Sequence, residues 1–175
     1  MKRKCFAVLA PLFFCVANYA QNPQMPQPAP ELKKLDYFVG TWKTDAEMKA
    51  SPNGPGGKMT ATDHNEWMQG NFFLMIHSNF SLGMGSGLEV GVMGYDPVRK
   101  VYTYASYNSF GEHETGTGTL DGDTWTWNSE QTGMPGGKWR YTQKILSPTS
   151  FSIKFEMAPD GSTWATAMEG KSTKQ

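Results

Sequence analysis

Cysteine is almost absent from this chain of 175 residues: Cys5 and Cys15 are the only two, and both lie near the N-terminus. Beyond them, disulfides, cysteine-ligated metals and cysteine nucleophiles are excluded. An excess of basic charge is also missing, because 16 basic residues face 16 acidic ones, so nothing indicates a nucleic-acid partner. The long apolar run at Phe6–Ala17 is too short to span a bilayer as a helix.

The N-terminus has the pattern of a secretory signal peptide. A basic start at residues 2–4 precedes the apolar run, and small residues follow in "CVANYAQ", as signal peptides require. We predict that residues 1–20 are removed, with cleavage after Ala17 or Ala20, and that the protein is periplasmic or secreted. The mature chain would then lack both cysteines, and its 13 basic and 16 acidic residues would give a net charge of −3.

Two short segments of different character follow the signal peptide. Residues 21–31, "QNPQMPQPAPE", hold four prolines among polar residues and are predicted to form an extended linker. Leu32, Leu35 and Phe38 then recur at helical spacing, which predicts one or two helical turns with an apolar side. We expect residues 32–172 to form a single domain.

From Gly40 onward, apolar residues alternate with polar ones, as they do in strands. Nine turn signals separate ten such stretches, and no helical stretch lies between them. The predicted fold class is all-β: a lipocalin-like, up-and-down antiparallel barrel of about ten strands, whose closure removes both sheet edges. A membrane-spanning barrel is disfavoured, because outward Arg140, Lys144 and Lys154 would meet lipid at about 2–4 kcal/mol for a cation at the midplane.

Two turns near the C-terminus predict the register of three strands. A loop at residues 147–149 places Arg140 opposite Glu156 on the polar face, which is a favourable pair. On the apolar face the same loop pairs Ile145 with Phe151, Gln143 with Ile153, Tyr141 with Phe155, and Trp139 with Met157. A two-residue turn at Asp160–Gly161 then pairs Met157 with Trp164, Phe155 with Thr166, and Ile153 with Met168.

A third turn, at Asp121–Gly122, brings large rings against bare backbone. It places Trp125 opposite Gly118 and Trp127 opposite Gly116. Glycine opposite tryptophan is how a closed or tightly curved sheet accommodates bulky rings inside. This pairing therefore also favours a barrel.

The stretch "FVGTW" at the start of the first strand resembles the Gly-x-Trp arrangement of lipocalin-like barrels. In those barrels a short helical turn closes one end, the glycine allows the bend into the strand, and the tryptophan caps the floor. The resemblance assigns these structural roles to Gly40 and Trp42. The alternative is an ordinary core tryptophan at the start of a strand.

Longer segments resemble one particular family. "GVMGYDPVRKVYTYASYNSFG", "TGTGTLDGDTWTW" and "GKWRYTQKILSPTSFSIKFEM" are similar to the family of domains of unknown function 1579, from about Leu32 to Lys171. Its motifs are mainly structural and imply no activity. The chain is more distantly similar to haem-binding nitrobindin barrels, whose haem ligand is a histidine near the C-terminus. No histidine follows His113 here, so we expect no haem and no other cofactor.

A possible metal site lies in "TDHNEWMQGNFFLMIHSNF". If Gly70–Asn71 is the turn, His64 lies opposite His77 and Glu66 opposite Met75. Two histidines and a carboxylate on one face are the ligands of many metal sites. The alternative is a polar patch at the barrel mouth or on the outer surface.

A second candidate is Glu114, which falls on the face of Trp125 and Trp127. An inward carboxylate could bind the polar end of a ligand or act as a base, whereas His113 should face solvent. The alternative is a hydrated residue at the barrel mouth.

These patterns favour an exported carrier or sensor of a small apolar ligand. The residues expected to line its site are Glu66, Met75, His77, Glu114, Trp125, Trp127, Trp139, Tyr141, Phe155 and Trp164. Two alternatives stay open: a small enzyme using an inward Glu66, His77 or Glu114, and a solid barrel acting as a structural or interaction module. The sequence predicts neither a catalytic residue nor an oligomeric state.

Overall fold

The protein is built from one short helix and ten strands, seen here in a computed structural model that describes residues 26–51, 55–83, 85–131 and 137–175. The expected signal peptide and its cleavage sites lie outside these ranges. The elements are the 3₁₀-helix η1 Pro30–Phe38 and the strands β1 Gly40–Met48, β2 Gly57–Trp67, β3 Leu74–Leu82, β4 Gly85–Asp96, β5 Val101–Asn108, β6 His113–Asp121, β7 Thr124–Gln131, β8 Lys138–Ser147, β9 Ser150–Ala158 and β10 Ala165–Lys174.

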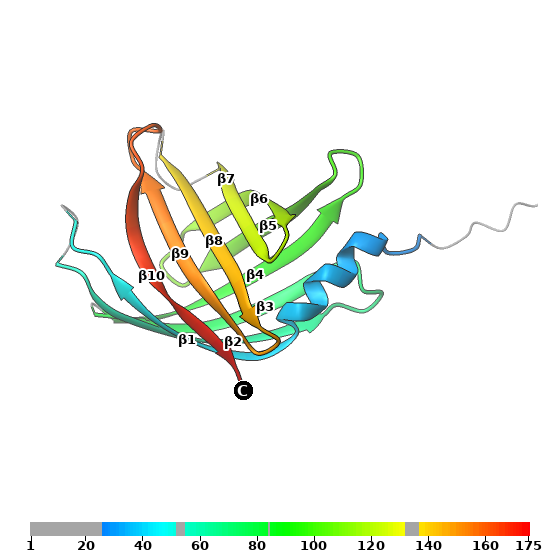
Figure 1. Cartoon of the computed structure of the whole chain (residues 1–175), viewed down its shortest axis with the longest axis horizontal. Helices are drawn as coiled ribbons and strands as arrows, with labels where there is room; N and C mark the ends of the chain where they lie inside the picture. The colour runs from blue at the N-terminus through cyan, green and yellow to red at the C-terminus, as the bar shows by residue number, and fades with distance from the viewer. Residues whose placement is uncertain (1–25, 52–54, 84, 132–136) are drawn as a thin grey trace, which may run out of the picture.

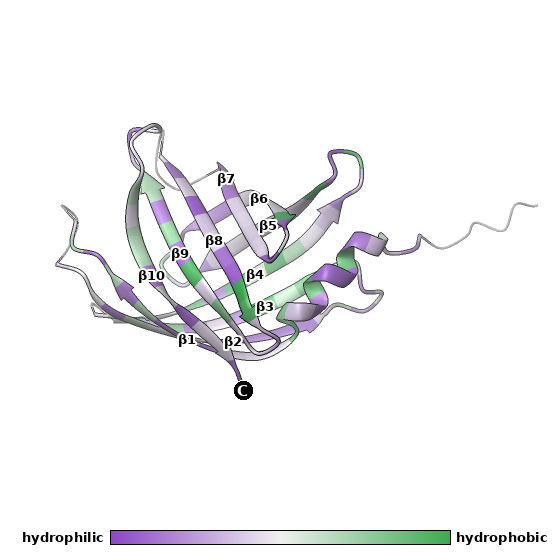
Figure 2. Cartoon of the chain, in the orientation of Figure 1, coloured by the Kyte–Doolittle hydropathy of each residue, from purple (hydrophilic) through white to green (hydrophobic). Residues whose placement is uncertain are grey.

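The strands form a closed antiparallel barrel in which each strand pairs with the next along the chain (Figure 1). β10 returns to β1 and closes the ring, with Trp42 opposite Lys174 and Thr44 opposite Ser172. Figure 2 shows hydrophobic and hydrophilic residues interspersed along the strands, as expected when successive side chains point to opposite faces. The predicted all-β meander barrel of about ten strands is confirmed.

One end of the barrel is closed by η1, which forms its floor. Leu32, Leu35 and Phe38 are buried there, and their spacing of three matches the three residues per turn of a 3₁₀-helix. The helix begins at Pro30, inside the segment expected to be linker. Among the described residues, no helix is long and apolar enough to cross a membrane.

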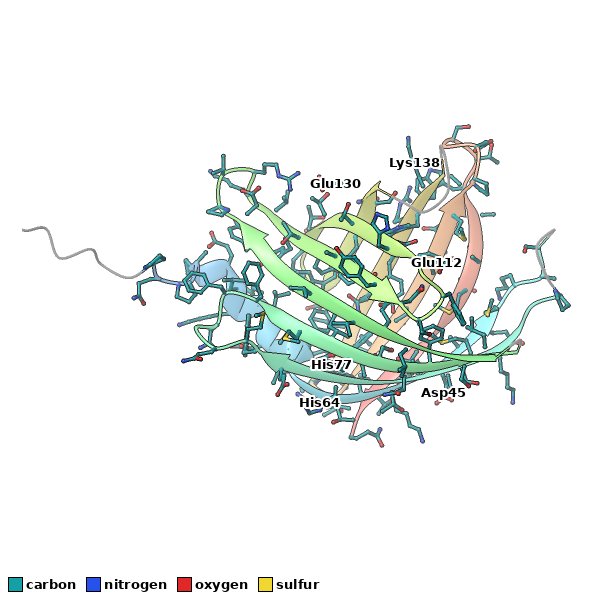
Figure 3. All side chains as sticks on the ribbon, turned by 180° about the vertical axis from the view of Figure 1, so that it is seen from behind. Asp45, His64, His77, Glu112, Glu130 and Lys138 are labelled. Carbon is teal, nitrogen blue, oxygen red and sulfur yellow. The ribbon has the colours of Figure 1, made fainter. Side chains whose placement is uncertain are left out.

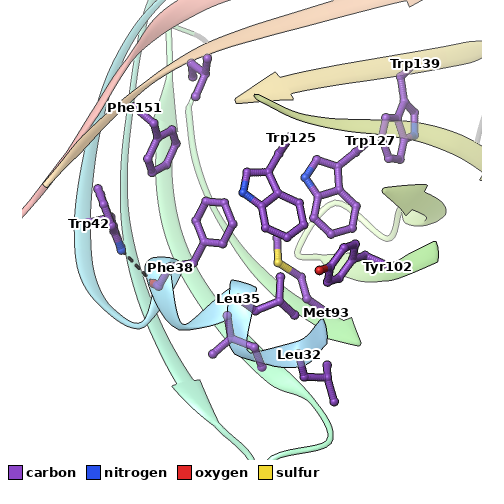
Figure 4. Close-up of a cluster of buried hydrophobic side chains, with 12 residues drawn as sticks. Leu32, Leu35, Phe38, Trp42, Met93, Tyr102, Trp125, Trp127, Trp139 and Phe151 are labelled. Carbon is purple, nitrogen blue, oxygen red and sulfur yellow. Dashed lines mark hydrogen bonds between the residues drawn. The ribbon is translucent and has the colours of Figure 1, made fainter. Parts of the chain in front are cut away.

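The Gly-x-Trp motif has the predicted structural role. Gly40 has a φ of +108°, a value that glycine adopts far more readily than other residues, and it turns the chain from η1 into β1. Trp42 is 1% exposed, and its indole Nε1 donates a hydrogen bond of 2.8 Å to the Phe38 carbonyl oxygen (Figure 4). The motif therefore ties the first strand to the floor.

The register predicted between β8 and β9 is confirmed at every pair. Tyr141 lies opposite Phe155, and Arg140 lies opposite Glu156 with 3.7 Å between the guanidinium and carboxylate atoms. The loop itself is shorter than predicted, because Ser147 belongs to β8 and pairs with Ser150 after an irregularity between Ile145 and Ser147.

The register predicted between β9 and β10 is wrong. Met157 lies opposite Ala165 rather than Trp164, because the Asp160 carboxylate accepts hydrogen bonds from the Ser162 and Thr163 amides and extends the turn. An irregularity between Thr166 and Met168 then shifts the pairing again, so that Met168 lies opposite Phe155 and Gly170 opposite Ile153.

The register predicted between β6 and β7 is also wrong, by two residues. Trp127 lies opposite Gly118, and Trp125 lies opposite Leu120, because the turn is centred one residue later than expected. A shift of two leaves every side chain on its predicted face. Large rings still face glycine inside the barrel.

Candidate functional site

The barrel contains a cavity of about 290 Å³. Phe38, Trp42 and Phe151 bound it on the side of the floor, and it extends as far as Met59 and Met168 toward the other end. This volume equals that of about ten water molecules in the liquid. The interior is therefore not filled by its own side chains.

One wall of the cavity is aromatic. Trp127, Trp139, Tyr141 and Phe155 line it from β7, β8 and β9. The Trp127 indole Nε1 donates a hydrogen bond of 3.0 Å to the Gln143 side-chain oxygen, which fixes the orientation of its ring. This wall is mainly apolar.

Glycines on β6 make room for these rings. A Cβ atom at Gly118 would lie 2.5 Å from the Trp127 ring, and one at Gly116 would lie 2.6 Å from the Trp139 ring. Neither ring could stay in place beside a larger residue. Beneath Trp127, Trp125 stacks in parallel with ring centroids 5.8 Å apart and is fully buried (Figure 4).

The cavity also has an acidic side, formed by Asp63 on β2, Glu89 on β4 and Glu114 on β6. Ser78 on β3 lies opposite Asp63 on β2 and opposite Glu89 on β4. Asp63, Ser78 and Glu89 therefore form one row across the sheet. The Ser78 hydroxyl donates a hydrogen bond of 2.6 Å to Asp63. The Tyr104 hydroxyl donates one of 2.8 Å to Glu89.

Burial changes the acidity of all three carboxyl groups. It raises the pKa of Asp63, although the Ser78 hydrogen bond opposes the rise. It raises the pKa of Glu89 against the Tyr104 hydrogen bond, with a further rise from nearby Asp63 and Glu112. The pKa of Glu114 rises from 4.5 to about 7, first through burial and then through the charges of Glu89 and Glu112.

Two buried polar atoms of the lining have no hydrogen-bond partner among the described residues. They are the side-chain oxygen of Asn65 and the indole nitrogen of Trp139, whose residues are 6% and 4% exposed. The Asn65 amide nitrogen donates to the Phe38 carbonyl oxygen at 2.9 Å, which fixes the side chain. Such atoms are uncommon in native proteins and call for an explanation.

The predicted ligand-site residues divide between the inside and the outside of the barrel. Those that line the cavity are Glu114, Trp127, Trp139, Tyr141 and Phe155. Trp125 lies below them in the core of the floor. Trp164 precedes β10 and packs under the guanidinium of Arg140, 4.2 Å from its ring centroid, and is not part of the lining.

The expectation that Glu66 and His77 point inward is wrong. Their register is as predicted, with His64 opposite His77 and Glu66 opposite Met75. However, Asp63, Asn65, Ile76 and Ser78 line the cavity, so the alternating Glu66, Met75 and His77 face outward, as does His64 (Figure 3).

On this outer face, the His64 and Glu66 side chains are 59% and 61% exposed, with 4.0 Å between the imidazole nitrogen and the carboxylate. Within the described ranges, no three His, Cys, Asp or Glu residues are placed to hold a metal ion.

Sequence reasoning missed Asp63 and Glu89. On β2, the apolar Met59 and Ala61 share a face with Asp63, and this pattern could have identified its inward position. On β4 the pattern misleads, because Leu88 and Val90 are exposed at 58% and 42% while Glu89 lies inside.

Comparisons with known proteins identify a family and a crystal structure of similar fold. A family model described as "Protein of unknown function (DUF1579)" matches residues 27–174, and no curated protein matches the sequence. The crystal structure of Rv2717c from M. tuberculosis is similar with a TM-score of 0.61 and 16% identity, over 85% of this chain and 99% of that one. A fluorescence-activating β-barrel designed de novo has a TM-score of 0.45 and 15% identity, over 80% of this chain and 95% of that one.

Proposed function

This chain belongs to the DUF1579 family of proteins of unknown function, and we propose that it binds a small molecule with an apolar body inside its barrel. The family itself assigns no activity. The proposal therefore rests on one observation, the cavity of about 290 Å³ between an aromatic wall and three carboxyl groups. Binding sites for small molecules are typically apolar, with a few placed polar groups.

The size of the cavity limits the ligand. A cavity of about 150 Å³ is enough to hold a benzene ring, so a space of about 290 Å³ suits a single ring with a short chain, or two fused rings. Trp127, Trp139 and Phe155 supply aromatic lining for such a body. The alternative of a solid barrel has less support, because its interior would have to be filled.

The enzyme alternative retains one of its three residues. Glu114 lies inside with a pKa of about 7, which suits a general base near neutral pH. His77 and Glu66 face outward, and no His, Lys or Cys is among the described residues that line the cavity. A binding protein needs no such partner, so we favour binding.

We also propose that the protein is exported and binds its ligand outside the cytoplasm. This proposal comes from the basic and apolar pattern of residues 1–20, which lie outside the described ranges. N-terminal sequencing of the mature protein tests it separately from ligand binding.

Two measurements test the proposed function. Native mass spectrometry of the protein purified from its own host should reveal a retained small molecule. Titration with toluene should quench or shift the tryptophan fluorescence, because Trp127 and Trp139 line the site.

A pair of variants localises the effect. Ala61→Phe fills the cavity from a buried inward position and should abolish the toluene response, whereas Thr62→Phe adds the same ring at an exposed neighbouring position and should preserve it. If toluene produced no response, or if both variants responded like the unaltered protein, binding inside the barrel would be disproved.

A further inference from the structure

The cavity carries negative charge without positive charge to balance it. Asp63, Glu89 and Glu114 line it, and no Lys, Arg or His belongs to the part of the lining that the structure describes. The ion pairs between described residues all lie elsewhere, and none includes these three carboxyl groups. Buried carboxylates are costly unless they are paired with a cation or fully hydrogen-bonded.

Two of the three carboxyl groups accept a hydrogen bond from another side chain of the protein. Asp63 accepts from Ser78, and Glu89 accepts from Tyr104. Glu114 accepts no hydrogen bond from any described residue, and its pKa is perturbed only by burial and by other carboxylates. It is the group most in need of an external donor.

A second feature of the lining, independent of its charge, also indicates a missing donor. The Asn65 side-chain oxygen is buried without a partner on a residue that is 6% exposed and lines the cavity. Its amide nitrogen is already used by the Phe38 carbonyl. Of the two partnerless atoms of the lining, the Trp139 indole nitrogen is a donor and the Asn65 oxygen is an acceptor, so a ligand that donates a hydrogen bond would satisfy Asn65.

The aromatic lining is compatible with a cation. Trp139, Tyr104 and Tyr141 present rings to the same space, and ring faces attract ammonium groups, more strongly when the cation is desolvated. Tyr104 also connects the acidic side of the cavity with its aromatic wall. Its hydroxyl donates a hydrogen bond to Glu89, and its ring lies edge-on to Trp139, with centroids 6.3 Å apart.

We propose that the ligand is a small organic cation: an amine whose ammonium group binds Glu114 and Glu89 and whose apolar body packs against Trp127, Trp139 and Phe155. This inference rests on the proposed function and specifies its ligand class. The cavity would reject a ligand of similar shape that carries a carboxylate, because every charged group facing it would be of like sign.

Proton release should accompany binding of the amine. The titratable groups that line the cavity with Glu114 or shift its pKa are all acidic: Glu89 on β4, Asp63 on β2, Tyr104 on β5, Tyr141 on β8 and Glu112 just before β6. The adjacent His113 is exposed and is not part of the lining. With a pKa of about 7, Glu114 is largely protonated below neutral pH and must lose its proton to pair with an ammonium group. Affinity for the amine should therefore fall as the pH drops below 7.

Calorimetric titration with three ligands of similar shape tests the inference. The ligands are 2-phenylethylamine, which stays cationic throughout, neutral 2-phenylethanol, and anionic 3-phenylpropanoate. At pH 8 the amine should bind about tenfold or more tightly than the alcohol, as expected for a charge-assisted hydrogen bond, and the carboxylate should not bind. At pH 5.5 the advantage of the amine should shrink, while the affinity for the alcohol should stay constant.

Variants test whether the preference for the amine arises from the carboxyl groups of the cavity. Glu114→Gln should remove most of the preference for the amine, and Glu89→Gln provides a second test if the first variant fails to fold. Glu66→Gln removes the same charge from the outer face and should leave the preference unchanged. If Glu114→Gln and Glu66→Gln lost the preference for the amine equally, the preference would come from the net charge of the protein. That result would overturn the inference.

The outcomes separate the inference from the proposed function. If the alcohol binds as tightly as the amine, the cation inference fails while small-molecule binding stands. If neither the amine, the alcohol nor toluene binds, the proposed function fails and the inference fails with it.

Discussion

Replacing Glu114 by glutamine should stabilise the protein at alkaline pH, which is unusual for the loss of a charged residue. Burial raises the pKa of this carboxyl group from 4.5 to about 7 in the folded state, so folding favours its protonated form. The stability that this proton provides is fully present below pH 4.5 and is lost as the pH rises through about 7. Glutamine is neutral throughout and avoids that loss.

The size of the effect follows from the width of this pH window. If Glu114 were fully shielded from solvent, the free energy of unfolding would fall by about 3 kcal/mol as the pH rose from 4.5 to above 7. Glu114 is only partly buried, and solvent screening reduces the expected gain in Glu114→Gln to about 1 kcal/mol at pH 8. At pH 4.5 the variant and the unaltered protein should have nearly equal stability.

Urea unfolding followed by tryptophan fluorescence at pH 4.5 and pH 8 measures this difference. Glu66→Gln is the matched control, because its side chain is 61% exposed on the outer face, and it should change stability by less than about 0.5 kcal/mol at both pH values. A Glu114→Gln variant that is less stable at pH 8, or that gains equally at both pH values, would show that the charged carboxylate is well solvated or paired in the folded state.

Three further predictions concern the floor, the aromatic wall and export. Trp42→Ala should destabilise the protein by about 3–5 kcal/mol in urea unfolding, and a loss below about 1 kcal/mol would contradict its role as the floor residue. Gly118→Ala places a methyl group 2.5 Å from the Trp127 ring, so it should cost about 1–3 kcal/mol by overpacking and alter the near-UV circular dichroism; an unchanged spectrum and stability would mean that the ring moves freely. N-terminal sequencing of exported protein should begin near Asn18 or Gln21, and an intact Met1 would exclude the signal peptide.

How far the sequence predicts strand pairing depends on the turn. The predicted β8–β9 pairs are correct because apolar residues alternate along both strands apart from Gln143, and the irregularity between Ile145 and Ser147 lies beyond those pairs. The β9–β10 pairing failed because Asp160 caps two amides of the loop, a side-chain interaction that the dipeptide Asp-Gly does not reveal. The β6–β7 error of two residues had no effect on which face each ring occupies.

The candidate site was harder to predict, because pairing alone does not reveal which face of a hairpin lies inside. His77 was paired correctly with His64 and still placed on the wrong side as a ligand-site residue. Glu89 could not have been found from alternation, since its strand exposes Leu88 and Val90 and turns a carboxyl group inward. The inner face of that strand departs from the usual pattern at a residue that we assign to ligand binding.

The seam between β1 and β10 also has a consequence for how the chain folds. There the buried Thr44 hydroxyl donates to the Ser172 hydroxyl over 3.1 Å, between residues 128 positions apart. The nine other pairings join neighbouring strands and can form as successive hairpins, whereas this one must wait until β10, the last strand of the chain, is available. Until then the nascent sheet has two free edges, so chaperone binding and intermolecular pairing compete with closure. Mutations in β10 should therefore reduce the yield of folded protein more than equally destabilising mutations in the middle strands.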